Sequence, residues 1–131
     1  MRAYYPVTPQ RLQVFLTSGS LQAERAFVVD QQLQGFDGEN GDDEEELEFQ
    51  ASWAAATRSR EIQGDSAKFG LVLALDLEPE QIGVVQADEV GLLTDLSWSQ
   101  VQSLLVSESA EIELSWFAPQ EIATYLPQWL A

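Results

Sequence analysis

Carboxylates are the most concentrated chemically active groups in this chain. Eight lie within the twelve residues of Asp37–Glu48. That spacing partly matches the calcium-binding EF-hand loop, whose sixth position needs glycine for a sharp turn. Here the sixth position is Asp42, and the fifth is Gly41, which offers no side-chain ligand. A loose, weak cation site fits this segment better than a specific calcium loop does. The simplest interpretation is a solvated loop that leads into a helix, because the helix macrodipole favours acids at an N-terminus.

The same acids are the candidate binding surface. The chain carries 22 acidic and 6 basic residues, which gives a net charge of -16. Such a field repels nucleic-acid phosphates and anionic membranes, and it attracts basic proteins. We therefore predict a basic protein partner, no nucleic acid and no membrane. The predicted partner-binding residues are the acids at the helix start: Asp42, Asp43, Glu44, Glu45, Glu46 and Glu48.

The chain has no histidine and no cysteine. This excludes disulfides, thiolate metal sites, the commonest general base and the histidine-dependent nucleophile triads. Phosphate-binding glycine motifs are also missing. We predict no catalytic residue, no metal ligand and no cofactor. The enzymatic alternative works through carboxylates, with or without a divalent metal, and needs at least two acids in one pocket.

Arginines and aromatic residues supply the other candidates. Arg2, Arg58 and Arg60 are expected to form structural ion pairs, although an arginine that lines a pocket with aromatics would indicate a ligand site. Aromatic side chains crowd the C-terminal region. Core packing is their ordinary role, whereas joint exposure would indicate a protein interface. These aromatic residues are Trp116, Phe117, Tyr125 and Trp129.

The elements that must position these groups begin with a strand at 2–7. Thr8 and Pro9 predict a helix start, and Gly19 predicts its end. A second strand is expected at 26–29. Residues 35–43, with their glycines and acids, predict a flexible acidic loop.

A long helix is expected at about 43–62. Its predicted apolar stripe is widened by aromatic residues, so we expect burial on more than one side. The stripe and its flanks are Leu47, Phe49, Ala51, Trp53, Ala54, Ala55, Ala56 and Ile62.

The second half of the chain is richer in strands. Residues 69–77 are nearly all apolar, which predicts a central strand covered on both faces. Shorter strands are expected at 82–85, 90–93 and 112–117. Residues 97–107 fit either one helix or a helical turn followed by a strand. A last helix starts at Pro119, and Pro127 is expected to bend or end it.

These elements predict an α+β fold in a single domain that spans residues 1–131. The expected sheet is mixed, with about five or six strands, and the long helix and the C-terminal helix cover it. The chain lacks an apolar export signal and any apolar run of about 18 residues, so we expect a cytoplasmic protein. The sequence does not determine an oligomeric state.

Three stretches resemble a known family. They are Met1–Thr8 with Leu12 following, the acidic helix start at Asp42–Phe49, and Leu114–Ile122. The set is similar to a family of small acidic cytoplasmic proteins from actinobacteria, a domain of unknown function. Phe49 and Phe117 stand where that family usually has tyrosine. The resemblance implies no activity, so the function expected from the sequence is unknown in detail. A non-enzymatic protein-interaction or regulatory protein is favoured over a carboxylate enzyme.

Overall fold

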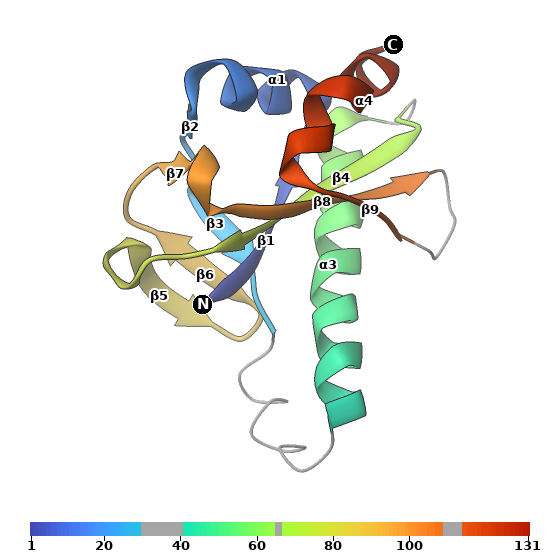
Figure 1. The fold of residues 1–131 in the computed structure, drawn as a ribbon. Coiled ribbons are helices and arrows are strands. Elements are labelled where there is room, and N and C mark those ends of the chain that lie inside the picture. The colour runs from blue at the N-terminus through green and yellow to red at the C-terminus, as the bar shows by residue number, and fades with distance from the viewer. Residues whose placement is uncertain (30–40, 65–66, 109–113) are drawn as a thin grey trace.

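The computed structural model describes residues 1–29, 41–64, 67–108 and 114–131 (Figure 1). Within α3, side chains are described from Glu45 onward. The expected α+β class is confirmed: within the described ranges, three α-helices pack on a seven-stranded sheet. No described helix is long and apolar enough to cross a membrane.

The seven strands follow the spatial order β5-β6-β3-β1-β4-β8-β9. Every observed pairing in the sheet is antiparallel, so the expectation of a mixed sheet with five or six strands is wrong. A short connection explains one of these pairings: two residues join β5 to β6, whereas parallel strands need a long crossover. The strands are β1 (Arg2–Val7), β3 (Arg25–Phe27), β4 (Phe69–Asp76), β5 (Ile82–Gln86), β6 (Glu89–Leu92), β8 (Val101–Glu108) and β9 (Leu114–Phe117).

A second sheet pairs β2 (Ser20–Leu21) with β7 (Leu96–Ser97). Strands of two residues are too short to show any alternation of polar and apolar side chains, so the sequence pattern did not indicate them. They join the segment that follows the first helix to the segment that precedes β8.

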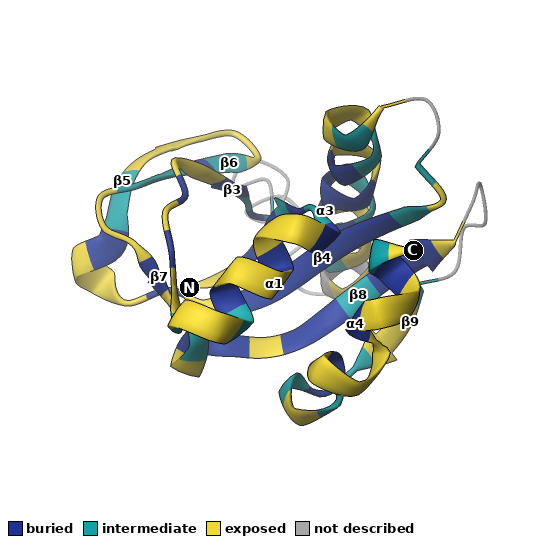
Figure 2. Ribbon diagram, turned by 90° about the horizontal axis from the view of Figure 1, so that it is seen from above, coloured by how far each residue is buried: buried dark blue, intermediate teal, exposed yellow. Residues whose placement is uncertain are grey.

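Helices cover both faces of the main sheet. The α1 helix (Pro9–Ser18) and the α4 helix (Ile122–Leu130) pack on one face, and α3 (Gly41–Gln63) packs on the other. Figure 2 shows the buried strands β4 and β8 running between α3 and α4. The two predicted covering helices are therefore confirmed, and α1 joins α4 on its side of the sheet. Its cap is as expected: Thr8 Oγ1 accepts from the Arg11 N–H at 3.2 Å.

The long helix α3 begins at Gly41, slightly before the predicted start, so the last residues of the predicted loop at 35–43 are helical. Residues 35–40 lie outside the described part of the chain. The predicted burial on more than one side is wrong. Phe49 is exposed, Ile62 is 55% exposed, and Trp53 is half-buried. The face on the sheet consists instead of small buried residues: Ala51, Ser52, Ala55, Ala56 and Ser59.

Small side chains bring α3 unusually close to the sheet. A Cβ atom built on Gly70 of β4 would lie 2.5 Å from the backbone oxygen of Ala56. One turn later, Ser59 Oγ donates to the Val7 carbonyl at 2.8 Å and accepts the Leu71 N–H at 3.0 Å. The helix thus contacts β1 and β4 through its backbone and a buried hydroxyl, and no large apolar side chain fits between them.

Residues 97–107 adopt the second of the two predicted forms. A 3₁₀ turn, η2 (Trp98–Gln100), leads directly into β8. Of the predicted strand at 112–117, residues 114–117 form β9, and the first two residues lie outside the described ranges. Pro127 does not end the last helix, because α4 continues to Leu130. Pro127 is the sixth of the nine residues of α4, so the helix contains a proline in its interior, and the missing N–H removes one hydrogen bond from the helix.

Two buried glutamines, Gln81 and Gln100, form hydrogen bonds that connect two 3₁₀ turns between the strands. Gln81 ends the turn η1 (Pro79–Gln81), and Gln100 ends η2. Gln81 Nε2 donates to Gln100 Oε1 at 3.1 Å, and Gln100 Nε2 donates back to Gln81 Oε1. Each side-chain oxygen also accepts the backbone N–H that precedes its own turn, from Glu78 and Ser97 respectively.

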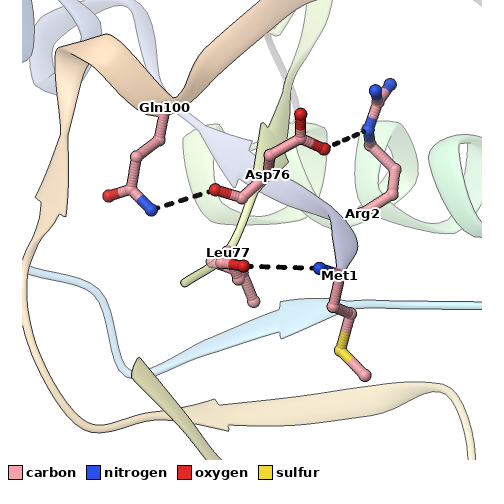
Figure 3. A network of polar contacts seen from close by, with 5 residues as sticks. All are labelled: Met1, Arg2, Asp76, Leu77 and Gln100. Carbon is pink, nitrogen blue, oxygen red and sulfur yellow. Dashed lines mark hydrogen bonds and ion pairs between the residues drawn. The ribbon is translucent and has the colours of Figure 1, made fainter. Parts of the chain in front are cut away.

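The glutamine pair also reaches the sheet. Gln100 Nε2 donates to the Asp76 carbonyl at 3.0 Å, at the end of β4 (Figure 3). Gln81 Nε2 donates to the Asp95 carbonyl at 3.0 Å. Two buried amides therefore satisfy backbone groups from four separate positions of the chain.

Candidate functional site

The outer edge of β9 is the candidate site. β9 pairs with β8 in a regular register from Ser107↔Leu114 to Leu104↔Phe117. It is the last strand of the sheet, and no strand in the described ranges pairs with its other side. Alternate residues of an edge strand leave their N–H and C=O groups unpaired toward the outside. The sequence of β9, Leu-Ser-Trp-Phe, contains neither a charge nor a proline that would block another strand.

Aromatic side chains flank this edge on both faces of the sheet. Trp116 pairs with Leu105, whose side chain packs on the α3 side, and Trp116 is 61% exposed. Phe117 packs on the other side, where its ring centroid lies 5.0 Å from that of Tyr125 in α4. Tyr125 is 39% exposed, so its ring is open to solvent beside Phe117.

The predicted aromatic group is therefore split between core and surface. Trp129 is buried against Phe117, at 5.1 Å between ring centroids, and has the ordinary core role. Trp116 and Tyr125 are both exposed, but they lie on opposite sides of the β9 edge and do not form one shared patch. Strand alternation in the sequence identified the strand, but it could not show that β9 lies at the edge of the sheet.

The opposite edge, β5, differs in one respect. Val84 there is 71% exposed, so this edge also presents apolar surface. However, the register between β5 and β6 shifts between Ile82 and Val85. Such bulges twist an edge strand away from further pairing. The regular register of β9 makes it the better template for an added strand.

The predicted partner-binding acids lie at the first turns of α3. Glu45 and Glu46 are exposed, and Glu48 is half-buried. The side chains of Asp42, Asp43 and Glu44 lie outside the described part, although their backbone is helical. The role of all six residues in partner binding stays a prediction.

Tyr4 links the acidic helix to the sheet. It is buried on the α3 face, and burial, helped by the nearby charge of Glu48, raises the pKa of Tyr4 to about 12. Arg2 opposes this effect and is itself paired with Asp76, at 3.0 Å between Arg2 Nε and Asp76 Oδ1 (Figure 3). The Arg2–Asp76 pair is exposed on both sides and contributes at most about 1 kcal/mol to stability.

We expect alkaline pH to destabilise the protein through Tyr4. Its pKa is about 12 in the folded chain, against 10.0 for an ordinary tyrosine. The stability that the protonated Tyr4 hydroxyl contributes is therefore complete below pH 10 and is lost between pH 10 and 12. The Tyr4→Phe variant should lose less stability across this window, by on the order of 1–2 kcal/mol. Urea unfolding at several pH values measures this difference. Equal losses in both proteins would contradict the assignment to Tyr4.

The predicted arginine pairs are partly confirmed. Arg58 Nη1 lies 3.2 Å from Glu61 Oε2, one helical turn away. Arg60 does not pair with a described carboxylate; its Nη2 donates to Ser107 Oγ at 2.6 Å. None of these arginines lines either of the two described cavities, but Arg11, which the sequence did not single out, lines one of them together with Tyr5.

Metal binding has no support in the described side chains, which include no cluster of three or more carboxylates placed to hold an ion. The enzymatic alternative requires a pair of acids in one pocket. Of the two cavities described for this chain, one is lined by a single acidic side chain, Glu24, and the other by none.

Comparison with known families adds one finding. A model of a family of unknown function, DUF6912, matches residues 1–112. The chain belongs to the DUF6912 family. Searches of curated proteins and of solved structures found no match. The DUF6912 match includes two of the three stretches on which the resemblance rested, and the third, from Leu114 onward, lies beyond it. The candidate edge β9 and the helix α4 therefore follow the matched region.

Proposed function

We propose that this protein is a non-enzymatic interaction protein that binds a basic, extended segment of a partner along β9. The open, regularly paired edge of β9 with exposed Trp116 is the observation that carries the proposal. An actinobacterial and cytoplasmic setting, implied by the resemblance, is part of the same proposal.

Binding of an added strand would use both the unpaired backbone groups of β9 and the aromatic side chains beside them. Backbone hydrogen bonds supply affinity, and side-chain contacts on alternate sides supply specificity. A segment that lies along β9 would place one set of side chains against Trp116 and the other against Phe117 and Tyr125. Trp116 and Tyr125 lie on different faces of the sheet, so these two sets of side chains belong to opposite faces of such a segment.

Charge selects the type of segment. The net charge of -16 attracts cationic partners and repels anionic ones. An arginine or lysine placed over the exposed face of Trp116 would also gain a cation–π contact, worth about 0.5–1 kcal/mol at an exposed site. Arg60 of α3 is a basic residue that contacts the neighbouring strand β8. It is half-buried and donates a hydrogen bond to Ser107.

The test uses a short synthetic peptide of alternating arginine and valine. We expect it to shift the backbone NMR signals of Leu114–Phe117 in a saturable way, and to bind more weakly as salt is added. The same peptide with N-methylated backbone should not bind, because it cannot donate strand hydrogen bonds. A glutamate–valine peptide should not bind either.

Variants locate the site. Trp116→Thr should weaken peptide binding about tenfold, as expected for loss of an aromatic anchor. Val84→Thr, at the opposite edge, is the matched control and should bind as the wild type does. Two outcomes overturn the proposal: no binding of the basic peptide at low salt, or shifts that centre on Glu45–Glu48 while β9 is unaffected. The second outcome would favour the acidic start of α3 as the partner site.

A further inference from the structure

A pocket beside β1, away from the β9 edge, is lined by two of the six basic residues of the chain, Arg11 and Arg25. It has a volume of about 440 Å³ and lies where β1, the start of α1, the segment before β3 and the end of α3 meet. This volume is within the range of about 300–1,000 Å³ that is usual for small-molecule sites. In the sheet, β4 and β8 separate β1 from β9, so this pocket is distinct from the proposed partner edge.

The pocket exists because β1 and β3 separate there. The two strands share one register pair, Tyr4↔Phe27. Two residues further, Pro6 would face Arg25, but proline has no N–H to donate to a neighbouring strand. The strands part beyond this point, and Tyr5, Pro6 and Arg25 become walls of the pocket.

Arg11 is held in the pocket without a carboxylate partner. Its Nη1 donates to Tyr5 Oη at 2.7 Å, and its Nη2 donates to the Gln22 carbonyl. The guanidinium carbon also lies 5.8 Å from the centre of the Tyr5 ring. Within the described part of the chain, Arg11 forms no ion pair. A guanidinium has more N–H donors than these contacts use, so Arg11 is oriented and still able to bind an anion.

Tyr5 adds a neutral donor beside Arg11. Its hydroxyl oxygen accepts from Arg11, which leaves its own proton free to donate. Burial raises the pKa of Tyr5, which keeps that proton in place at neutral pH. Arg25 adds a second positive charge, because its ion pair with Glu89 is long, at 3.8 Å, and its side chain is 64% exposed. The charged residues of the pocket lining are Arg11, Arg25 and Glu24. The lining therefore has a net positive charge, although the protein as a whole is strongly acidic.

We infer that this pocket binds a small organic oxyanion, a carboxylate or phosphate attached to an apolar body. Arg11, Tyr5 and Arg25 bind the oxyanion, since guanidinium groups form paired, charge-assisted hydrogen bonds with both anions. The apolar body lies on Pro6 and on Ile62, whose side chain is 55% exposed at the end of α3. The packing of α3 on the sheet does not explain why Ile62 is exposed, whereas contact with the apolar body of a ligand does.

Three probes that share one apolar body test the inference: benzoate, phenyl phosphate and benzyl alcohol, each titrated into the full chain at equal ionic strength. We expect saturable NMR shifts of Arg11 Nε–H and of the amides of Gln22–Arg25 and Ile62 with at least one anion, and none with the alcohol. The tighter anion identifies a carboxylate or a phosphate site. Equal effects of the alcohol and the anions would overturn the inference, as would no shift with either anion.

Three variants make the test specific. Arg11→Gln should weaken binding at least about tenfold, and Arg25→Gln, at an exposed position that should not affect folding, should weaken it by a smaller factor. Arg58→Gln removes the same charge from an exposed pair outside the pocket and should bind normally. Thermal unfolding checks that each variant is folded. Unchanged binding in both pocket variants overturns the inference, as do shifts centred on Lys68 and Gln63, which line a second cavity of about 420 Å³.

Discussion

Gly70→Ala is expected to destabilise the protein by on the order of 3 kcal/mol, the upper part of the usual range for overpacking. The added Cβ would lie 2.5 Å from Ala56 O, a distance that real Cβ atoms essentially never adopt, and 3.1 Å from Ala56 C, which is tighter than most real Cβ contacts. Both neighbours are backbone atoms of α3, so no side-chain rotation relieves the contact. The helix must move away from β4, and the hydrogen bonds of Ser59 to Val7 and Leu71 would lengthen with it.

Chemical denaturation measures this effect as a lower midpoint with an unchanged slope. Gly91→Ala is the matched control, because a Cβ on Gly91 in β6 would meet its nearest neighbour, Val84 O, at an ordinary 3.6 Å. Its stability should stay within about 0.5 kcal/mol of the wild type. A Gly70→Ala protein as stable as the Gly91→Ala protein would show that α3 does not pack on β4 as closely as described.

Gln100→Leu should also cost on the order of 3 kcal/mol. The leucine removes the acceptor for Ser97 N–H and for Gln81 Nε2, and the donor for the Asp76 carbonyl. Gln100 is 8% exposed and Gln81 is 6% exposed, so water does not easily replace these partners. A buried polar group without a partner costs about 1–3 kcal/mol, and this change leaves several.

A double-mutant cycle with Gln81→Leu shows whether the two glutamines act as a unit. The double variant should be less destabilised than the sum of the single variants, because each single change already leaves the other amide without its partner. Gln102→Leu, at an exposed position of β8, controls for the substitution itself. Strict additivity of the two single changes would contradict a coupled pair.

The sequence predicted the elements whose signals are local. Thr8, Pro9 and Gly19 mark α1 because caps act through neighbouring backbone groups. The apolar run at 69–77 indicated a strand covered on both faces, and β4 is that strand, in the interior of the sheet between β1 and β8. Features that depend on contacts between residues far apart in the sequence could not be predicted. The apolar residues of α3 predicted which side of the helix is buried. The side that packs on the sheet consists instead of small residues, because the helix backbone lies directly against Gly70 and leaves no space for large side chains.

The candidate sites depend on tertiary structure for the same reason. Composition alone established the acidic field and the absence of histidine and cysteine chemistry. The alternation of polar and apolar residues over 112–117 also indicated that Trp116 lies on a strand. Only the order of strands decided that β9 is an edge, because register and neighbours are set by pairing across the sheet. Only the fold brought Arg11 onto Tyr5 beside Arg25, since these residues come from a helix and two strands that separate at Pro6. Charge and residue type are properties of the chain, whereas which charges meet, and which strand remains unpaired, are properties of its packing.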